Sequence, residues 1–170
     1  MADKTYEVIA SNYFLEPGYI YVAAKPTVIS TVMGSSVVVC IHDRKLKIGG
    51  VNHFLYPKAE KQEEATALFG NAATLTLIRM MIENGSKTKH LEAQIMGGAH
   101  NPEISPIDMG RRNVMAARRV LTKRGIRIVS EDVGGNKGRK IVFHTNINEM
   151  AILKVDNLRK SDWYPYEGNR

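Results

Sequence analysis

The sequence predicts an α+β fold: a layered α/β sandwich with mixed sheets and two main helices. Two segments carry apolar residues at helical spacing, and about seven shorter segments are rich in β-branched and aromatic residues. The short segments cluster in hairpins, which favours stacked layers over a Rossmann-type alternation of strand and helix. The 170 residues suffice for one domain with its own core, expected at 1–156, followed by a polar tail at 157–170.

The first half of the chain predicts three strands and a helix. Strands are expected at 19–24, at the valine-rich segment 36–42 and at the return segment 48–56. The pair Gly49-Gly50 indicates a bulge or a close backbone approach in the return strand. A helix is expected at about 63–84, ended by Gly85, with an apolar stripe of Leu68, Ala72, Leu75, Ile78 and Ile82.

The second half predicts a strand, a helix and three further strands. The strand at 91–96 enters a turn at Gly97-Gly98, and Asp108 is a good N-cap for a helix that runs to about residue 124. The predicted buried stripe of this helix is Val114, Ala117 and Leu121. Strands follow at 126–130, 140–145 and 151–155, separated by a tight polar turn at 134–138 and a turn at 146–149.

The charge pattern allows two interpretations. The net charge is +7, and much of it lies in one stretch without acids: Arg111, Arg112, Arg118, Arg119, Lys123, Arg124 and Arg127. The stretch could bind nucleic acid, or it could be the solvated face of a helix that an acidic protein partner contacts. No aromatic residues interleave with it and no nucleic-acid motif is present, so the second interpretation is favoured.

Several other function classes are disfavoured by the sequence. No apolar run is long enough to span a membrane, and the N-terminus lacks the apolar region of a signal peptide. A single cysteine, Cys40, fits a reducing compartment, so we expect a cytoplasmic protein. The glycine pairs do not fit phosphate-loop spacing, and the histidines do not fit metal-site spacing. We therefore expect neither a cofactor nor a metal.

One pair of residues has chemical potential. Ser36 follows a turn of small residues, and His53 lies on the return strand, where it could face Ser36 as a base faces a nucleophile. Ser30 or Thr31 could supply a hydroxyl that orients the imidazole, and backbone N–H groups of the turn could stabilise an oxyanion. The spacing alone is unspecific, because a histidine in a strand is more often structural. Cys40 is more simply explained as a small buried hydrophobic residue.

Five collinear blocks resemble the CheD family of chemoreceptor glutamine deamidases. The segment from Met33 to Val39 is similar to the family signature Leu-Gly-Ser-Cys-Val-x-Val, and residues 49–57 are similar to its Gly-Gly-Met-x-His-x-x-Leu-Pro. Residues 91–99, 110–114 and 131–139 resemble three further family segments. The blocks extend over roughly 19–155, in order and at matching spacing.

The resemblance implies a function and a set of site residues. CheD proteins hydrolyse glutamine side-chain amides on chemoreceptors with a Cys–His pair, and their fold is similar to that of cytotoxic necrotizing factor toxins. By this resemblance His53 is the catalytic histidine, Ser30 the assisting hydroxyl and Ser36 the nucleophile position. The family has cysteine at that last position, so this chain is either a natural serine-bearing member or a deliberate Cys→Ser variant. Serine is harder to deprotonate, and we expect impaired turnover.

The resemblance also implies partners, and it leaves alternatives open. The implied partners are chemoreceptor cytoplasmic helices and, in some members, the phosphatase CheC. The chain could instead be a non-catalytic protein that docks on receptors or CheC. The same site could also hydrolyse methyl esters of receptor glutamates.

Overall fold

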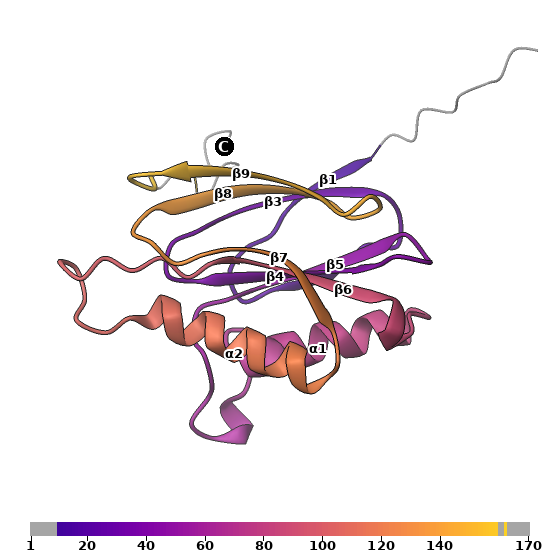
Figure 1. Cartoon of the computed structure of the whole chain (residues 1–170), viewed down its shortest axis with the longest axis horizontal. Helices are drawn as coiled ribbons and strands as arrows, with labels where there is room; N and C mark the ends of the chain where they lie inside the picture. Colours follow the sequence, from indigo (N-terminus) through magenta and orange to yellow (C-terminus); the bar gives the residue numbers. More distant parts are fainter. Residues whose placement is uncertain (1–9, 160–161, 163–170) are drawn as a thin grey trace, which may run out of the picture.

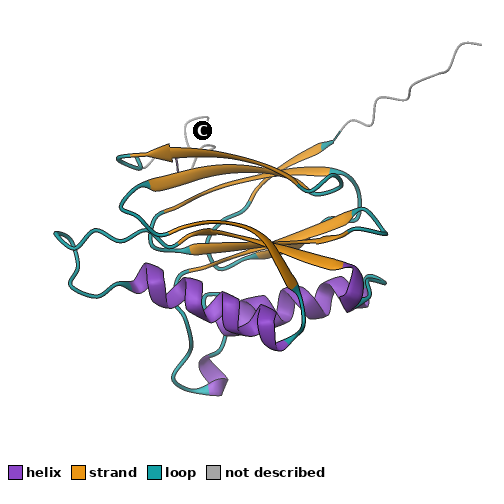
Figure 2. Cartoon of the chain, in the orientation of Figure 1, coloured by secondary structure: helices purple, strands orange, loops and turns teal. Residues whose placement is uncertain are grey.

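The computed structural model describes residues 10–159 and 162. Two β-sheets and a pair of helices form three layers (Figure 1; Figure 2). The first sheet has the strand order β1-β3-β8-β9, and the second has the order β2-β5-β4-β6-β7. Both helices cover the outer face of the second sheet, whose inner face packs against the first sheet. The layered α+β prediction is therefore confirmed.

The four-stranded sheet consists of β1 (Ser11–Phe14), β3 (Thr27–Met33), β8 (Gly138–His144) and β9 (Glu149–Val155). The five-stranded sheet consists of β2 (Ile20–Val22), β4 (Val37–Asp43), β5 (Ile48–Phe54), β6 (Leu91–Gly97) and β7 (Arg127–Val133). Two pairings are parallel, β1 with β3 and β6 with β7, so both sheets are mixed. The sequence did not predict β1 or β3, and β3 carries part of the candidate site.

The helix α1 (Gly70–Glu83) is shorter than the helix expected at 63–84. A separate 3₁₀ turn covers Gln62–Glu64, and the Leu68 carbonyl accepts hydrogen bonds from the N–H groups of Leu55 and Tyr56. The chain just before residue 70 thus pairs with the end of β5 and does not form a helix. The predicted apolar stripe was largely wrong, because Leu68, Leu75 and Ile82 are exposed. The buried residues of α1 are Gly70, Ala73, Thr74, Leu77, Ile78 and Met81.

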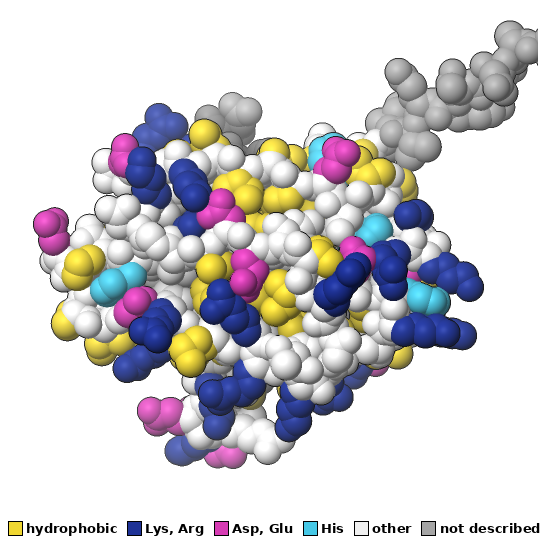
Figure 3. Space-filling model, viewed as in Figure 1, with side chains coloured by type: hydrophobic (Ala, Val, Ile, Leu, Met, Phe, Trp, Pro, Cys, Tyr) yellow, Lys and Arg dark blue, Asp and Glu magenta, His cyan; other side chains and the backbone are white. Residues whose placement is uncertain are grey.

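The helix α2 (Met109–Lys123) agrees with its prediction. Asp108 caps it by accepting a hydrogen bond of 2.8 Å from the Arg111 N–H. Val114, Ala117 and Leu121 are buried against the five-stranded sheet, as expected. The basic stretch lies on and just after α2, and two of its members form ion pairs, Arg118 with Glu131 and Arg127 with Glu92. Lys and Arg side chains are spread over the visible face and do not gather in one patch (Figure 3).

The Gly49-Gly50 pair allows a close approach without a bulge. The β4–β5 register is continuous from Val37↔Phe54 to Asp43↔Ile48, so the bulge prediction was wrong. A Cβ atom at Gly49 would lie 2.7 Å from the Thr145 carbonyl oxygen, and one at Gly50 would lie 2.8 Å from Leu77 Cδ1. Each glycine therefore lets β5 pack tightly against a neighbouring layer.

Two apolar clusters fill the spaces between the layers. One lies between the five-stranded sheet and the helices and includes Val37, Val39 and Ile41. The other lies between the sheets and includes Ile29, Met33, Val38, Cys40 and Phe143. Alternation along β4 explains this division, because successive side chains point to opposite faces. None of the helices in the described part of the chain is long and apolar enough to cross a membrane. Of the tail expected at 157–170, residues 160–161 and 163–170 lie outside the described residues.

Candidate active site

The candidate site lies where the chain crosses from one sheet to the other. The strand β3 belongs to the four-stranded sheet and β4 to the five-stranded sheet, and residues 34–36 join them. We call residues 34–36 the nucleophile turn. Ser36 precedes the first residue of β4 and is only 4% exposed. Each of its neighbours in the turn is small, which lets other segments approach its backbone closely.

The structure brings Ser36 and His53 together. His53 lies opposite Val38 in the β4–β5 ladder, and Ser36 shares the face of Val38, so the two side chains meet diagonally. The distance from Ser36 Oγ to His53 Nε2 is 2.8 Å. His53 is fully buried between the two sheets. The geometric possibility that the sequence left open is therefore realised as a hydrogen bond.

The hydroxyl beside the imidazole is that of Thr31, and this differs from the expectation for Ser30. Thr31 Oγ1 lies 3.1 Å from His53 Nδ1. In β3, Ile29, Thr31 and Met33 face the second sheet, whereas Ser30 alternates to the other face. The family resemblance implied Ser30, but strand alternation places Thr31 at the histidine. The sequence analysis offered both Ser30 and Thr31 as the hydroxyl. A prediction of β3 would have been needed to choose between them.

The hydrogen bonds around Thr31 assign the histidine tautomer. The Thr31 hydroxyl donates its single proton to the Leu15 carbonyl oxygen, at 2.6 Å. It can therefore only accept from His53, so Nδ1 carries the ring proton and Nε2 is unprotonated. With this tautomer Nε2 accepts the Ser36 hydroxyl proton. This arrangement lets His53 act as a base toward Ser36.

Burial sets the protonation state of His53. Desolvation lowers its pKa to about 4, and the Leu15 carbonyl acts in the opposite direction. The imidazole is therefore neutral at neutral pH and able to accept a proton. It is also a weak base, because the imidazolium form is poorly solvated between the sheets.

Backbone contacts fix the nucleophile turn. The Gly98 N–H donates to the Ser36 carbonyl at 2.8 Å, and the Ala99 N–H donates to the Gly34 carbonyl at 2.9 Å. Gly97 and Gly98 have φ values of 109° and 68°, and a Cβ atom at Gly97 would lie 2.3 Å from the Ser36 carbonyl oxygen. Glycine is needed here for both its conformation and its small size.

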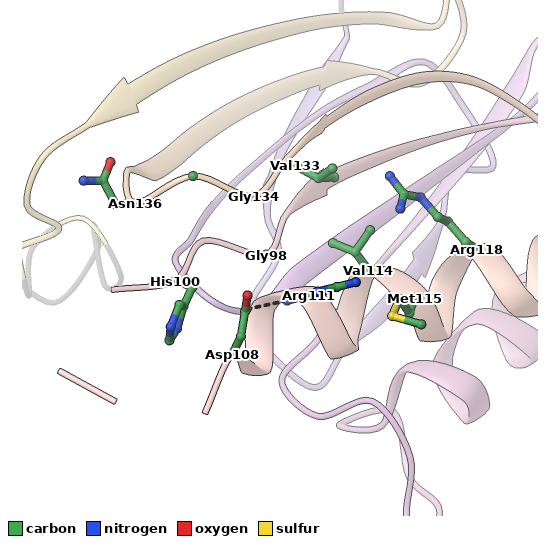
Figure 4. A pocket seen from close by; sticks show the side chains of 11 residues that line it. Gly98, His100, Asp108, Arg111, Val114, Met115, Arg118, Val133, Gly134 and Asn136 are labelled. Carbon is green, nitrogen blue, oxygen red and sulfur yellow. Dashed lines mark hydrogen bonds between the residues drawn. The ribbon is translucent and has the colours of Figure 1, made fainter. Parts of the chain in front are cut away.

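Two cavities lie near the site, and the smaller one borders the nucleophile turn. One of about 370 Å³ is bordered by Gly34 and Ser35 and by Ile104 and Ile107 of the loop after β6. A larger one of about 760 Å³ lies between the N-terminal part of α2 and the turn around Gly134 (Figure 4). His100, Arg111 and Arg118 lie at its edge, and Val114 and Met115 contribute apolar surface.

Cys40 does not belong to the pair. It lies on the same inner face of β4 as Val38, as the strand alternation predicts, but it is buried in the apolar cluster between the sheets. Burial raises the pKa of its thiol. The cysteine is thus protonated and enclosed. In the described residues, no group of His, Cys, Asp or Glu could hold a metal ion.

Comparisons with known proteins identify the family of this chain. The family described as CheD chemotactic sensory transduction matches residues 55–154, more than half of the chain. A protein of Anaeromyxobacter dehalogenans named "Probable chemoreceptor glutamine deamidase CheD 1" is 39% identical over 138 residues, which cover 80% of each chain. A similarly named protein of Sulfurimonas denitrificans is 35% identical, with 84% of this chain and 93% of the relative covered. The relative from Methylobacillus flagellatus is 32% identical, and its alignment covers 94% of this chain and 80% of the relative. This chain belongs to the CheD family.

Proposed function

We propose that this protein deamidates selected glutamine side chains of chemoreceptors to glutamate, by acyl transfer at Ser36 and His53. The observation that carries the proposal is the buried chain of hydrogen bonds Ser36–His53–Thr31–Leu15 at the junction of the two sheets. A nucleophile, a base in the correct tautomer and a group that orients the base are what acyl transfer requires. The names of the relatives supply the substrate class.

The reaction would proceed in two steps. The Ser36 oxygen attacks the carbon of the glutamine amide, and its proton passes to His53 Nε2. The imidazolium then gives this proton to the leaving nitrogen, so that ammonia departs and an ester of Ser36 remains. A water molecule, deprotonated by His53, attacks the ester carbon; the returning proton regenerates the Ser36 hydroxyl and glutamate is released.

Backbone N–H groups would stabilise the oxyanion that forms in both steps. Among the described residues, the Ser36 N–H donates none of the backbone hydrogen bonds that hold the turns and loops. This N–H belongs to the same residue as the attacking oxygen, and the turn that carries it is fixed by hydrogen bonds from Gly98 and Ala99. A fixed donor at this place stabilises developing negative charge without reorganisation.

The environment of His53 favours a thiol nucleophile over a hydroxyl. The group beside His53 Nδ1 is the neutral Thr31 hydroxyl, and burial holds the pKa of His53 at about 4. Such a weak base removes a proton from a thiol far more easily than from a serine hydroxyl. We infer that this chain turns over slowly and that Ser36→Cys accelerates it.

The test compares four proteins on a receptor cytoplasmic fragment: the parent chain, Ser36→Cys, Ser36→Ala, and Ser36→Cys with His53→Ala. Ammonia release and the amide-to-acid mass change of receptor peptides are measured. Ser36→Cys should release ammonia fastest, and the two variants that lack the nucleophile or the base should release none above background. A folded Ser36→Cys protein that leaves every receptor glutamine intact would contradict the proposal. A fragment with methyl-esterified glutamates tests ester hydrolysis, which is read from methanol release and from the ester-to-acid mass change of its peptides.

A second candidate is a binding protein that occupies receptors or CheC without chemistry. Ser36 at the nucleophile position favours it, as does the cavity of about 760 Å³ between α2 and the turn around Gly134, which has room for partner side chains (Figure 4). This reading requires binding with Ser36 in place. Titration of the parent chain with receptor fragments and with CheC decides it, because two flat titrations exclude it. Both candidates place the protein in the cytoplasm, where these partners are found.

A further inference from the structure

A buried asparagine connects the two halves of the candidate site. Asn113 lies on the inner face of α2 and is fully buried. Its Nδ2 group donates to the Ser35 carbonyl at 3.0 Å and to the Leu55 carbonyl at 2.8 Å. Ser35 precedes the nucleophile position, and Leu55 follows His53 by two residues. One side-chain amide thus ties the nucleophile turn to the end of the strand that carries the histidine.

The packing of α2 explains how Asn113 reaches both carbonyls. Gly110 and Asn113 are three residues apart and therefore lie on the same helix face. A Cβ atom at Gly110 would lie 2.2 Å from the Gly98 carbonyl oxygen and 2.5 Å from that of Ala99. The absence of a side chain at 110 lets the helix backbone touch the segment that holds the turn. Asn113, one turn further along α2, then extends into the junction.

The hydrogen bond from Asn113 to the Ser35 carbonyl also sets the direction of the Ser36 N–H, which the proposed reaction uses. The Ser35 carbonyl and the Ser36 N–H belong to one planar trans peptide and point in opposite directions. When Asn113 holds the carbonyl, it also fixes the direction of the Ser36 N–H, the donor proposed for the oxyanion. The carbonyls of Gly34 and Ser36 are held by backbone N–H groups, whereas that of Ser35 is held by the Asn113 side chain.

The orientation and the cost of this amide argue for a specific role. Two carbonyl acceptors require the nitrogen at their side, because the reverse orientation would place oxygen against oxygen. The Asn113 oxygen is then buried with no hydrogen-bond partner among the described residues. An unsatisfied buried oxygen is unfavourable, and such groups call for an explanation. An apolar residue would fill the space without this cost but could not hold the two carbonyls.

We propose that Asn113 is a positioning residue, which holds the nucleophile turn in register with the His53 strand and directs the Ser36 N–H toward the oxyanion that forms on the substrate amide. Its catalytic consequence rests on the proposed deamidation. Its effect on the contact between residue 36 and His53 does not, and that contact can be measured without any substrate.

The first experiment measures alkylation of the Ser36→Cys protein by iodoacetamide as a function of pH. The parent chain, whose single cysteine is the buried Cys40, gives the background rate that is subtracted. The Ser36→Cys/His53→Ala double variant gives the profile expected when no imidazole contacts the thiol. Asn113→Ala and Asn113→Asp, each combined with Ser36→Cys, should shift the profile more than halfway to that limit. Asn113→Ser retains one donor, so its profile should lie between those of the other two Asn113 variants and that of the Ser36→Cys protein. With three variants, the comparison remains possible if one of them does not fold.

The control is Thr74→Val in the same Ser36→Cys background. Thr74 is fully buried on α1 and accepts a hydrogen bond of 3.3 Å from Asn52, away from the nucleophile turn. The Thr74→Val variant loses one buried hydrogen bond, but its alkylation profile should be the same as that of the Ser36→Cys protein. On the receptor fragment, Asn113→Ala should lower kcat roughly tenfold or more with little change in KM, since misplaced reacting groups slow the chemical step.

The outcomes separate the two proposals. Alkylation profiles of the Asn113 variants that coincide with the Ser36→Cys profile, together with a kcat no lower than that of Thr74→Val, would overturn the role of Asn113. Absence of ammonia release from the Ser36→Cys protein would overturn the deamidase proposal alone. The shift of the alkylation profile would still decide whether Asn113 positions the turn.

Discussion

The exchange Thr31→Val tests the assignment of the orienting hydroxyl to β3. Valine has nearly the shape of threonine but neither donates nor accepts. The Leu15 carbonyl would lose its 2.6 Å donor, and His53 Nδ1 would lose the acceptor at 3.1 Å. The ring could then adopt the other tautomer, in which Nε2 carries the proton and cannot receive one from residue 36.

The expected magnitude follows from the buried groups that lose a partner. Leaving one buried polar group unsatisfied costs about 1–3 kcal/mol, which corresponds to roughly a 5- to 150-fold loss of rate if the cost falls on the reactive arrangement. The Leu15 carbonyl also acts on the imidazole and can retain part of the orientation, which favours the lower part of this range.

The assay measures kcat for ammonia release in the Ser36→Cys background, with Ser30→Ala as the matched control. Ser30 lies next to Thr31 in sequence but on the other face of β3, so its removal should change kcat less than twofold. Thermal unfolding of both variants shows whether they remain folded. A large loss of rate in Ser30→Ala with a normal rate in Thr31→Val would refute the assignment and restore the residue implied by the family motif.

Three further predictions concern stability and reactivity. The pKa of His53 is about 4 in the folded protein and 6.5 when unperturbed, so the unfolded state binds more protons between these values. The free energy of unfolding should therefore fall as the pH drops from 6.5 toward 4, by up to about 3 kcal/mol from this group. Urea unfolding across this pH range should show a smaller pH dependence for His53→Gln than for the parent chain. An equal dependence in the two proteins would contradict the reasoning. Gly50→Ala places a Cβ atom 2.8 Å from Leu77 Cδ1 and should cost about 1–3 kcal/mol in thermal unfolding, whereas Gly34→Ala meets no atom within 4 Å and should cost little. Cys40 should react with a thiol reagent only after denaturant is added, because it is buried and burial raises the pKa of its thiol; rapid labelling of the folded protein would show that the inter-sheet core opens.

The sequence predicted most of the fold because the relevant signals are local. The cap at Asp108 and the buried stripe of α2 depend on neighbouring residues and were confirmed. The start of α1 was wrong because residues 66–69 pair with the end of β5, a tertiary contact that helical periodicity does not register. The absence of a bulge at Gly49-Gly50 likewise depends on what β5 packs against.

The candidate site was predicted in part for a related reason. Ser36 and His53 lie on one hairpin, so pairing across two adjacent strands could be foreseen from spacing. Thr31 reaches His53 from the other sheet, and its selection over Ser30 required the alternation of a strand that was not predicted. Asn113 lies on a helix far along the chain, and its role emerges only when α2 is packed against residues 98 and 99.

The position of the site at the junction of two sheets links activity to completed folding. Ser36 and His53 lie on one hairpin of the five-stranded sheet, whereas Thr31 comes from the four-stranded sheet, so neither sheet alone contains the complete site. A chain whose sheets have not yet packed together would lack the hydroxyl that orients His53. Glutamine is a common residue of proteins, and an amidohydrolase that reacted before it could select its target would damage other proteins. Because the two sheets must pack together to complete the site, full reactivity would arise only when the surface that recognises the substrate has also formed.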